Sequence, residues 1–283
     1  MGSSMNSSEH QGLPHLRNHL FLRAEHLWEF SILLAVGMLA VTIVGLWVNK
    51  PFIVSTVGLV ALVFPVAVSW MREAANVAQL RADKCRRLIL LSDGLGHEIA
   101  PAELAEVRAW GLGVKLDQAP FVKPYYSSTL PFGFQRLADI SAEAAFFTEQ
   151  LAGRMATALK SAFYVALVAA IVALALIDFP GSAVQSSIVL GAKSVAIFLA
   201  FLISGDFLLI ANKYSDLRDA AQRAYQRCAR LRTDGNVSAG EVRAVVEDHG
   251  VSLTHCPPVP SWLYSYYRDE LNSIYRQSHH VDK

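Results

Sequence analysis

Residues 187–212, SIVLGAKSVAIFLAFLISGDFLLIAN, decide the fold of this chain. The stretch is long and apolar enough for a helix that crosses a bilayer, yet it contains Lys193 and Asp206. A charged side chain at membrane depth costs roughly 3 kcal/mol or more. A helix that keeps two of them is not expected to face lipid on all sides. We therefore expect one helix here, around which three other spans pack and which lines a polar path.

The composition places the chain among membrane proteins. Of its 283 residues, 53% are hydrophobic and 17% are charged, whereas soluble domains carry about 25% charged residues. The net charge of +1 gives no strong attraction to nucleic acid, so no nucleic acid polymer is expected as a partner. The three cysteines fit no zinc-binding spacing, which indicates reduced thiols and no metal site.

Three further apolar runs complete a four-span pattern. They cover residues 30–48, 52–71 and 161–177, each near the roughly 20 residues that a spanning helix needs. Short links join them into two tight hairpins. The sequence therefore predicts an all-α membrane protein of two transmembrane hairpins. Its expected segments are an N-terminal part with an amphipathic helix (1–29), hairpin 1 (30–71), a helical insert (72–160), hairpin 2 (161–212) and a helical C-terminal region (213–283).

The lysines and arginines gather on one side of the predicted hairpins. They are frequent in the segments that follow the second and fourth spans and rare at the two hairpin tips. By the positive-inside rule, both termini and the middle segment are expected in the cytosol. The residues concerned are Arg72, Arg81, Lys84, Arg86 and Arg87 after the second span, and Lys213, Arg218, Arg223, Arg227 and Arg230 after the fourth.

The two halves of the chain repeat a short series of residues. Cys85-Arg-Arg-Leu after the first hairpin matches Cys228-Ala-Arg-Leu after the second, and Glu106-Val-Arg matches Glu241-Val-Arg. Because each copy holds two spans, both enter the membrane in the same sense, which predicts a parallel internal repeat. The matching apolar stripes predict that the helices after the two hairpins pack on each other or on a neighbouring subunit.

Several short motifs carry a resemblance to a known family. They are Lys123-Pro-Tyr-Tyr-Ser-Ser, Gly133-Phe-Gln-Arg-Leu-Ala, Ser141-Ala-Glu-Ala-Ala-Phe-Phe-Thr and Pro260-Ser-Trp-Leu-Tyr, the last leading to Arg268. With two hairpins around a cytosolic insert, the chain resembles the SMODS- and SLOG-associating four-transmembrane effector family. The resemblance implies a bacterial anti-phage effector of the inner membrane, which permeabilises that membrane when a cyclic or other nucleotide second messenger signals infection.

Four spans in one subunit enclose little lumen, so a pore requires several copies and we expect a homo-oligomer in the lipid bilayer. Two other functions fit the same sequence. One is a small oligomeric channel or transporter with a housekeeping role, which a parallel repeat also permits. The other is a scaffold whose spans only anchor the cytosolic helices. The oligomeric state is the observation that separates a pore from an anchor.

The intramembrane charges allow more than one interpretation. Lys193 either extends its long side chain to the outer headgroups or contributes to a polar pore, where it could also pair with Asp178. Asp206 has a short side chain that reaches the interface poorly. It is expected to have a partner inside the bundle, or to be hydrated at the interface through Lys213.

The small residues of the same stretch offer a second candidate pore surface. Ser187 and Ser194, with Gly191 between them, form a small-residue face. Such a face commonly serves the close packing of helices. The candidate pore or intramembrane polar residues are therefore Asp206, Lys193, Ser187 and Ser194.

Arginines and aromatic residues in the cytosolic parts could bind a nucleotide. Charges and stacking faces of this kind recognise single nucleotides, although solvated faces and membrane-proximal anchors explain the same arginines equally well. The candidate residues are Arg86, Arg87, Arg136, Tyr125, Tyr126 and Trp262. The sequence holds no P-loop, GxGxxG, GxSxG or HExxH motif, so neither an enzyme nor a cofactor is expected.

Overall fold

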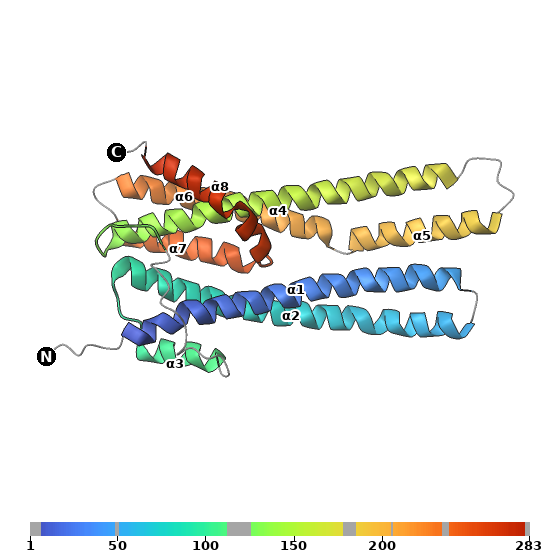
Figure 1. The fold of residues 1–283 in the computed structure, drawn as a ribbon, viewed down its shortest axis with the longest axis horizontal. Coiled ribbons are helices and arrows are strands. Elements are labelled where there is room, and N and C mark those ends of the chain that lie inside the picture. Colours follow the sequence, from blue (N-terminus) through green and yellow to red (C-terminus); the bar gives the residue numbers. More distant parts are fainter. Residues whose placement is uncertain are drawn as a thin grey trace. The chain divides into compact units, whose positions relative to one another are not determined.

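The computed structural model describes residues 7–48, 51–111, 126–177, 185–204, 206–233 and 238–280. Within these ranges the chain forms helices and no strand, which confirms the predicted all-α class (Figure 1). The helices are α1 (Ser7–Trp47), α2 (Pro51–Leu95), α3 (Pro101–Trp110), α4 (Phe134–Ile177), α5 (Gln185–Ser204), α6 (Phe207–Thr233), α7 (Ala239–Thr254) and α8 (Ser261–His280).

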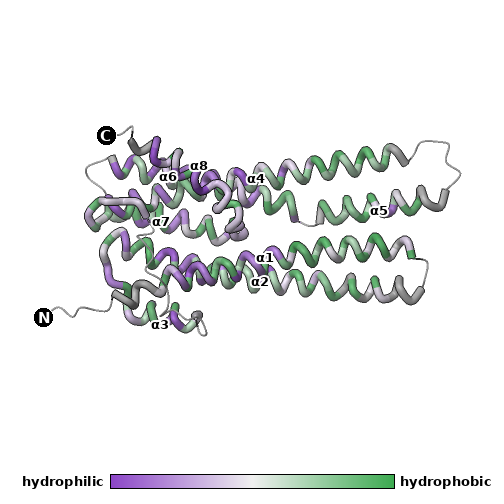
Figure 2. The backbone as a smooth tube through the Cα atoms, in the orientation of Figure 1, coloured by the Kyte–Doolittle hydropathy of each residue, from purple (hydrophilic) through white to green (hydrophobic). Residues whose placement is uncertain are grey.

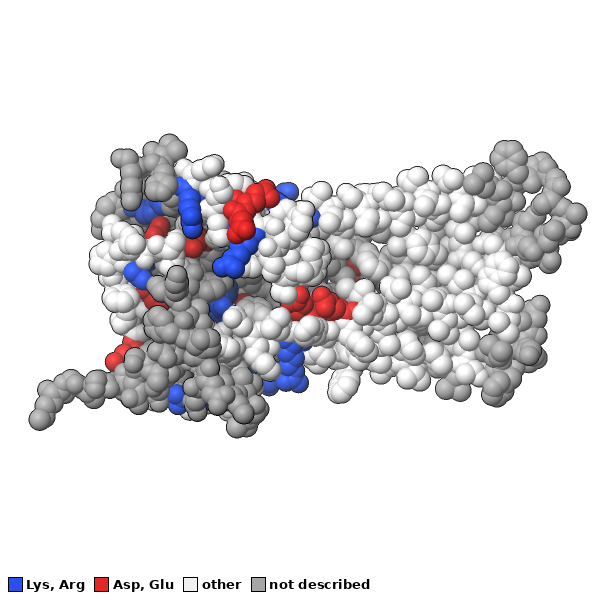
Figure 3. Space-filling model, viewed as in Figure 1, with Lys and Arg blue, Asp and Glu red and all other residues white. Residues whose placement is uncertain are grey.

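Four segments of the described chain are helical, long and apolar enough to cross a membrane, so this is a multi-pass membrane protein. Figure 2 shows the apolar residues concentrated in the hairpin parts of α1, α2 and α4. On the face drawn in Figure 3, the coloured charges gather over the opposite ends of these helices. The four segments are Gly12–Gly45, Thr56–Leu95, Phe134–Ala175 and Val189–Arg232, the last of which combines most of α5 with most of α6.

The chain divides into two compact units, and long helices run from one into the other. Unit 1 consists of Met1–Glu25, Ala75–Gly153 and Tyr214–Lys283. Unit 2 consists of His26–Ala74 and Arg154–Lys213 and contains the two apolar hairpins. Each unit has its own internal contacts.

Two helices extend further than the sequence pattern indicated. The amphipathic N-terminal part and the first span form one helix, α1, because no breaking residue separates them after Pro14. Gly250 is a residue type that commonly ends a helix, and the sequence indicated an end there, but α7 continues past it to Thr254. Glycine in a helix costs about 1 kcal/mol relative to alanine. A glycine ends a helix only where the N–H groups that follow it pair with the last carbonyl groups of the helix.

The stretch expected to be one helix at residues 187–212 is interrupted. Helix α5 ends at Ser204 and α6 begins at Phe207, and Asp206 between them has a φ of 58°. Aspartate tolerates this left-handed conformation better than most residues. The Asp206 carbonyl accepts the backbone N–H of Ile210 at 2.7 Å, so α6 starts directly after the break. The prediction of a continuous helix was therefore wrong.

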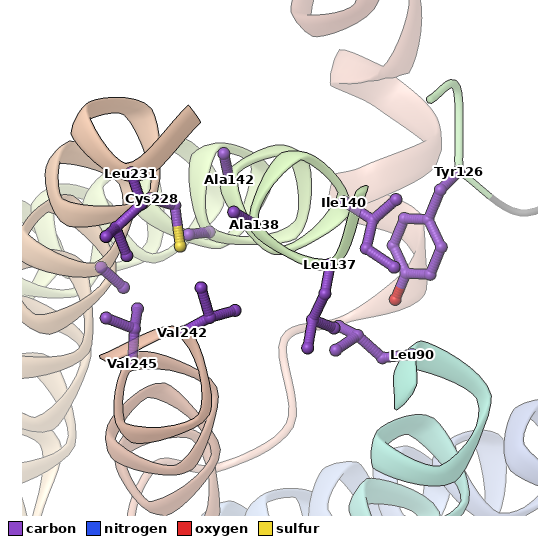
Figure 4. Packing of buried hydrophobic residues seen from close by; sticks show 12 residues of the cluster. Leu90, Tyr126, Leu137, Ala138, Ile140, Ala142, Cys228, Leu231, Val242 and Val245 are labelled. Carbon is purple, nitrogen blue, oxygen red and sulfur yellow. The ribbon is translucent and has the colours of Figure 1, made fainter. Parts of the chain in front are cut away.

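Unit 1 contains two apolar cores with a parallel composition. The first joins α1, α2 and α3 and contains Cys85 and Val107, each 0% exposed. The second lies mainly among α4, α6 and α7 and contains Cys228 and Val242, which are also 0% exposed (Figure 4). Residues matched between the two halves thus occupy equivalent places. Each stripe is buried mainly by helices of its own half, and not by packing of the two stripes on each other.

Candidate functional site

A cavity of about 850 Å³ lies within unit 1. Its walls come from α2, the segment after it, α3, α4, α6 and α7, so it is formed between helices of the first and the second half of the chain. Apolar side chains of α2 and α7 line much of it, and polar side chains occupy the rest. The polar lining residues on which the site depends are Asp83, Arg86, Arg87, Ser141, Arg243 and His249.

Helix α2 places an acid and a base side by side in this cavity. Asp83 and Arg86 are three residues apart and therefore share one face of the helix. Cys85 is buried in the first core, which turns the neighbouring face toward the cavity. Asp83 is 7% exposed, and its Oδ1 lies 3.3 Å from Arg86 Nε. This pair is shielded from water, so any of its polar atoms that lacks a hydrogen bond destabilises the folded state.

Helix α7 contributes His249 on the same face as two core valines. Val242, Val245 and His249 follow helical spacing, so the histidine is drawn inward with them. His249 is 6% exposed. Burial, with a smaller contribution from the Arg86 charge, lowers the pKa of His249 to about 3. The imidazole is therefore neutral at pH 7, with one nitrogen that donates and one that accepts a hydrogen bond.

Three buried polar atoms of the cavity residues have no partner in the described part of the chain: Asp83 Oδ2, Ser141 Oγ and His249 Nε2. Arg86 Nε makes no well-aligned hydrogen bond either, but it lies 3.3 Å from Asp83 Oδ1 in the ion pair. Buried polar groups in folded proteins are almost always paired, because an unpaired one costs about 1–3 kcal/mol. Three such atoms on three helices around one cavity indicate a site that a ligand with both donors and acceptors would complete.

The charges of the cavity lining balance. Its rim carries an ion pair between α2 and α7, in which Arg87 lies 4.0 Å from Glu247. Arg243 stacks over Phe134 at 5.9 Å and keeps its guanidinium close to the rim. The lining holds Lys84, Arg86, Arg87 and Arg243 against Asp83, Glu98, Glu103 and Glu247. A bare anion is therefore less suitable than a ligand with a polar neutral part and a charged part.

The residues predicted to bind a nucleotide are only partly brought together. Arg86 and Arg87 line the cavity. Arg136 instead donates to the carbonyls of Asp93 at 2.6 Å and Leu130 at 2.7 Å. It joins α4 to the end of α2 and does not line the cavity. Of the aromatic candidates, Tyr126 is buried in the second core, Trp262 is exposed on α8, and Tyr125 lies outside the described residues.

Unit 2 provides the partner that Asp206 was expected to need. Arg72 Nη1 lies 3.4 Å from Asp206 Oδ2, and its guanidinium also stacks over Trp28 at 5.0 Å. Arg72 follows the apolar run that ends at Met71, and the Asp206 side chain is 48% exposed. The Asp206 carboxylate thus pairs with a charge from the end of another span.

The remaining intramembrane candidates differ in their surroundings. Lys193 is exposed. The Ser194 hydroxyl donates to the Leu190 carbonyl at 3.0 Å and accepts the Trp47 indole N–H at 3.3 Å, so it serves contact between α5 and α1. The side chain of Ser187 and the whole of Asp178 lie outside the described residues.

Family models, curated proteins and solved structures yield no match to this chain. The cavity is therefore interpreted from its own residues. Among the described residues, no group of histidine, cysteine and acidic side chains could hold a metal ion. All three cysteines are buried and none of them forms a disulfide. The arrangement is suited to holding a small molecule, through paired charges and neutral donors and acceptors.

Sequence reasoning did not single out Asp83, Ser141 or His249. Each has other polar or charged residues within two positions of it in the sequence, and the sequence pattern alone does not tell a buried polar side chain from an exposed one. The available signal was the i, i+3 spacing of Asp83 and Arg86. The helical alignment of His249 with Val242 and Val245 was a second one.

Proposed function

We propose that this chain is a ligand-controlled membrane effector that permeabilises the bacterial inner membrane. The observation that carries the proposal is the cavity between the two halves of unit 1. Its floor is built from Asp83 and Arg86 on α2 and Ser141 on α4. Both helices continue into the apolar hairpins of unit 2. A ligand bound there would contact the helices that cross the membrane.

The physical basis of such control is the difference in free energy between two packings of these helices. A ligand shifts an equilibrium only if it binds one state better than the other. The three unpaired polar atoms of the cavity supply this difference, because a packing that lets a ligand reach them gains hydrogen bonds that the empty cavity lacks. Relative movement of α2 and α4 would then pass along continuous helices.

A nucleotide second messenger is the ligand class that we propose first. Arg87 and Arg243 at the rim can hold phosphate groups, while the neutral imidazole of His249 and the Ser141 hydroxyl can meet a base. The resemblance to four-transmembrane effectors supplies the setting, an anti-phage response. A partner protein that delivers the signal is the alternative trigger, and a homo-oligomer is the form that we propose for the open path.

Leakage of a dye from vesicles that contain the full chain tests the proposal. We expect release on addition of one member of a panel of cyclic and linear nucleotides, and loss of that response in Arg86→Ala. Arg227→Ala is the matched control, since Arg227 is an exposed arginine that pairs with Asp248 outside the cavity lining. Folding of each variant is checked by circular dichroism. Release that Arg86→Ala leaves unchanged would remove the cavity from the mechanism.

The same assay examines the polar residues of unit 2. Replacement of Asp206 by alanine would remove the charge and also strain the backbone, because Asp206 has a φ of 58°. Asparagine tolerates this conformation, so Asp206→Asn isolates the charge. We expect Asp206→Asn to abolish release while the protein still inserts, and Lys193→Ala to act more mildly. A housekeeping channel would conduct without a nucleotide, and an anchor would release no dye under any condition.

A further inference from the structure

Helix α8 begins with aromatic side chains that the described part of the chain leaves uncovered. Trp262 is 58% exposed and Tyr266 is 76% exposed, and the two are one helical turn apart. The opposite face of α8 is buried, with Leu263 at 6%, Leu271 at 0% and Tyr275 at 7% exposure. The helix is thus fixed on one side and presents a Trp–Tyr pair on the other.

Three hydrogen-bonding side chains hold the segment that leads into α8. The Gln79 amide donates to the carbonyls of Leu253 at 3.0 Å and Cys256 at 2.8 Å. The Tyr214 hydroxyl donates to the Pro258 carbonyl at 3.0 Å.

The third of these side chains holds the first residue of the helix itself. Glu25 Oε1 accepts from Ser261, from the backbone N–H at 2.7 Å and from the hydroxyl at 2.8 Å. Glu25 is 7% exposed, so these bonds are shielded from water. The position of Trp262, the next residue, is therefore well defined.

Each of these three side chains comes from the first turns of unit 1 beyond an apolar run. Glu25 precedes the run that begins at Phe30, Gln79 follows the one that ends at Met71, and Tyr214 follows residue 212. At a rise of 1.5 Å per residue, Glu25, Gln79 and Tyr214 lie roughly 8, 12 and 3 Å along the helix axis from the ends of their apolar runs. The polar headgroup layer on each side of a bilayer is about 5–8 Å thick. The start of α8 is therefore fixed to the parts of α1, α2 and α6 that emerge from the hydrocarbon.

Tryptophan and tyrosine favour the headgroup layer. Their apolar ring suits the hydrocarbon side of the layer, and their polar N–H or O–H group suits the water side. Helix α8 becomes more polar along its length, as expected if its first turns lie in the headgroup layer and the rest extends into water. Its first turns carry the aromatic pair, whereas Asp269, Asn272 and Arg276 follow further along. We propose that the Trp262–Tyr266 face of α8 binds the lipid headgroup layer and so ties unit 1 to the membrane surface.

Tryptophan quenching in vesicles tests the proposal with the full chain. The vesicles contain phosphatidylcholine brominated close to the glycerol backbone, which quenches tryptophans at shallow depth. The chain has five tryptophans. Because Trp110 is not expected to be quenched by lipid, Trp262→Phe should lower the quenchable emission by about one part in four. Trp110→Phe is the matched control, since Trp110 lies in α3 beneath Arg81 and Lys84 and should not be quenched by lipid.

Two added tryptophans give the result a second, independent readout. On a Trp262→Phe background, Tyr266→Trp should restore quenching by brominated lipid, whereas Ser273→Trp, further along α8, should respond to aqueous acrylamide. If emission from positions 262 and 266 is quenched by acrylamide alone, the face lies in water and the proposal fails. If neither quencher reaches it, a second protein surface covers the face, and the proposal fails as well.

Discussion

His249 is the residue whose ionisation opposes the folded state most directly. Its pKa is lowered from 6.5 to about 3 because burial removes water from the charged form, and Arg86 adds repulsion. Between these two values the unfolded chain binds one more proton than the folded chain. The stability associated with neutral His249 is therefore complete above pH 6.5 and declines as the pH falls toward 3.

This linkage predicts an acid sensitivity that one substitution removes. At about 1.4 kcal/mol per pH unit, the loss from pH 6.5 to about 4.5 is about 3 kcal/mol. We expect His249→Gln, which cannot titrate, to have a flatter dependence of the unfolding midpoint on pH than the wild type. The measurement is thermal unfolding of the full chain in detergent across this range. Parallel curves for the two proteins would contradict the assignment.

At the scale of helices, the sequence predicted what depends on local pattern. Apolar runs near 20 residues predicted four spans. Pro101 followed by Glu103 is likewise a local pattern typical of a helix start, and α3 is observed at Pro101–Trp110. The pairing of Arg72 with Asp206 could not be predicted in this way, because the two residues are 134 positions apart. The cavity is also non-local, since the polar side chains of its lining come from helices far apart in the sequence, among them α2, α4 and α7.

The junction between α2 and α4 is a helix contact that tolerates no added atom. A Cβ at Gly94 would lie 2.9 Å from Leu137 Cα and 2.7 Å from its Cδ1, closer than real contacts allow. The Gly94 carbonyl also accepts the Gly133 N–H at 2.9 Å. The two halves of unit 1 therefore meet through backbone at this point, and a side chain would force them apart.

We expect Gly94→Ala to destabilise the protein by about 1–3 kcal/mol from overpacking, partly offset by the better helix propensity of alanine. Gly250→Ala in α7 is the matched opposite, since nothing lies within 4 Å of its added Cβ. This variant should be more stable by up to about 1 kcal/mol. Denaturant midpoints of both variants, measured against the wild type in detergent, check the pair. A destabilised Gly250→Ala together with a neutral Gly94→Ala would contradict the helix contacts described here.

For the molecule as a whole, the number of subunits decides between a pore and an anchor. The four spanning segments of one copy form two hairpins. Two glycines of the first hairpin differ in whether another helix packs against them. A Cβ at Gly45 would lie 3.1 Å from Val57 Cγ2, so this glycine serves the contact between α1 and α2. Gly37, two turns earlier on the same face, has nothing within 4 Å of the corresponding position. An open glycine in a spanning helix permits the close approach of another helix.

We therefore expect several copies per particle when the full chain is extracted in lipid nanodiscs and weighed by native mass spectrometry. Gly37→Leu should lower the copy number, because a bulky side chain keeps a neighbouring helix at a distance. Val36→Leu is the control, since Val36 is already large and is 45% exposed on the adjacent position. A monomer in lipid would contradict a multi-subunit path, because one copy encloses little lumen, and would favour a membrane anchor for unit 1. An oligomer that persists in Gly37→Leu would instead place the subunit contacts on another face of the hairpins.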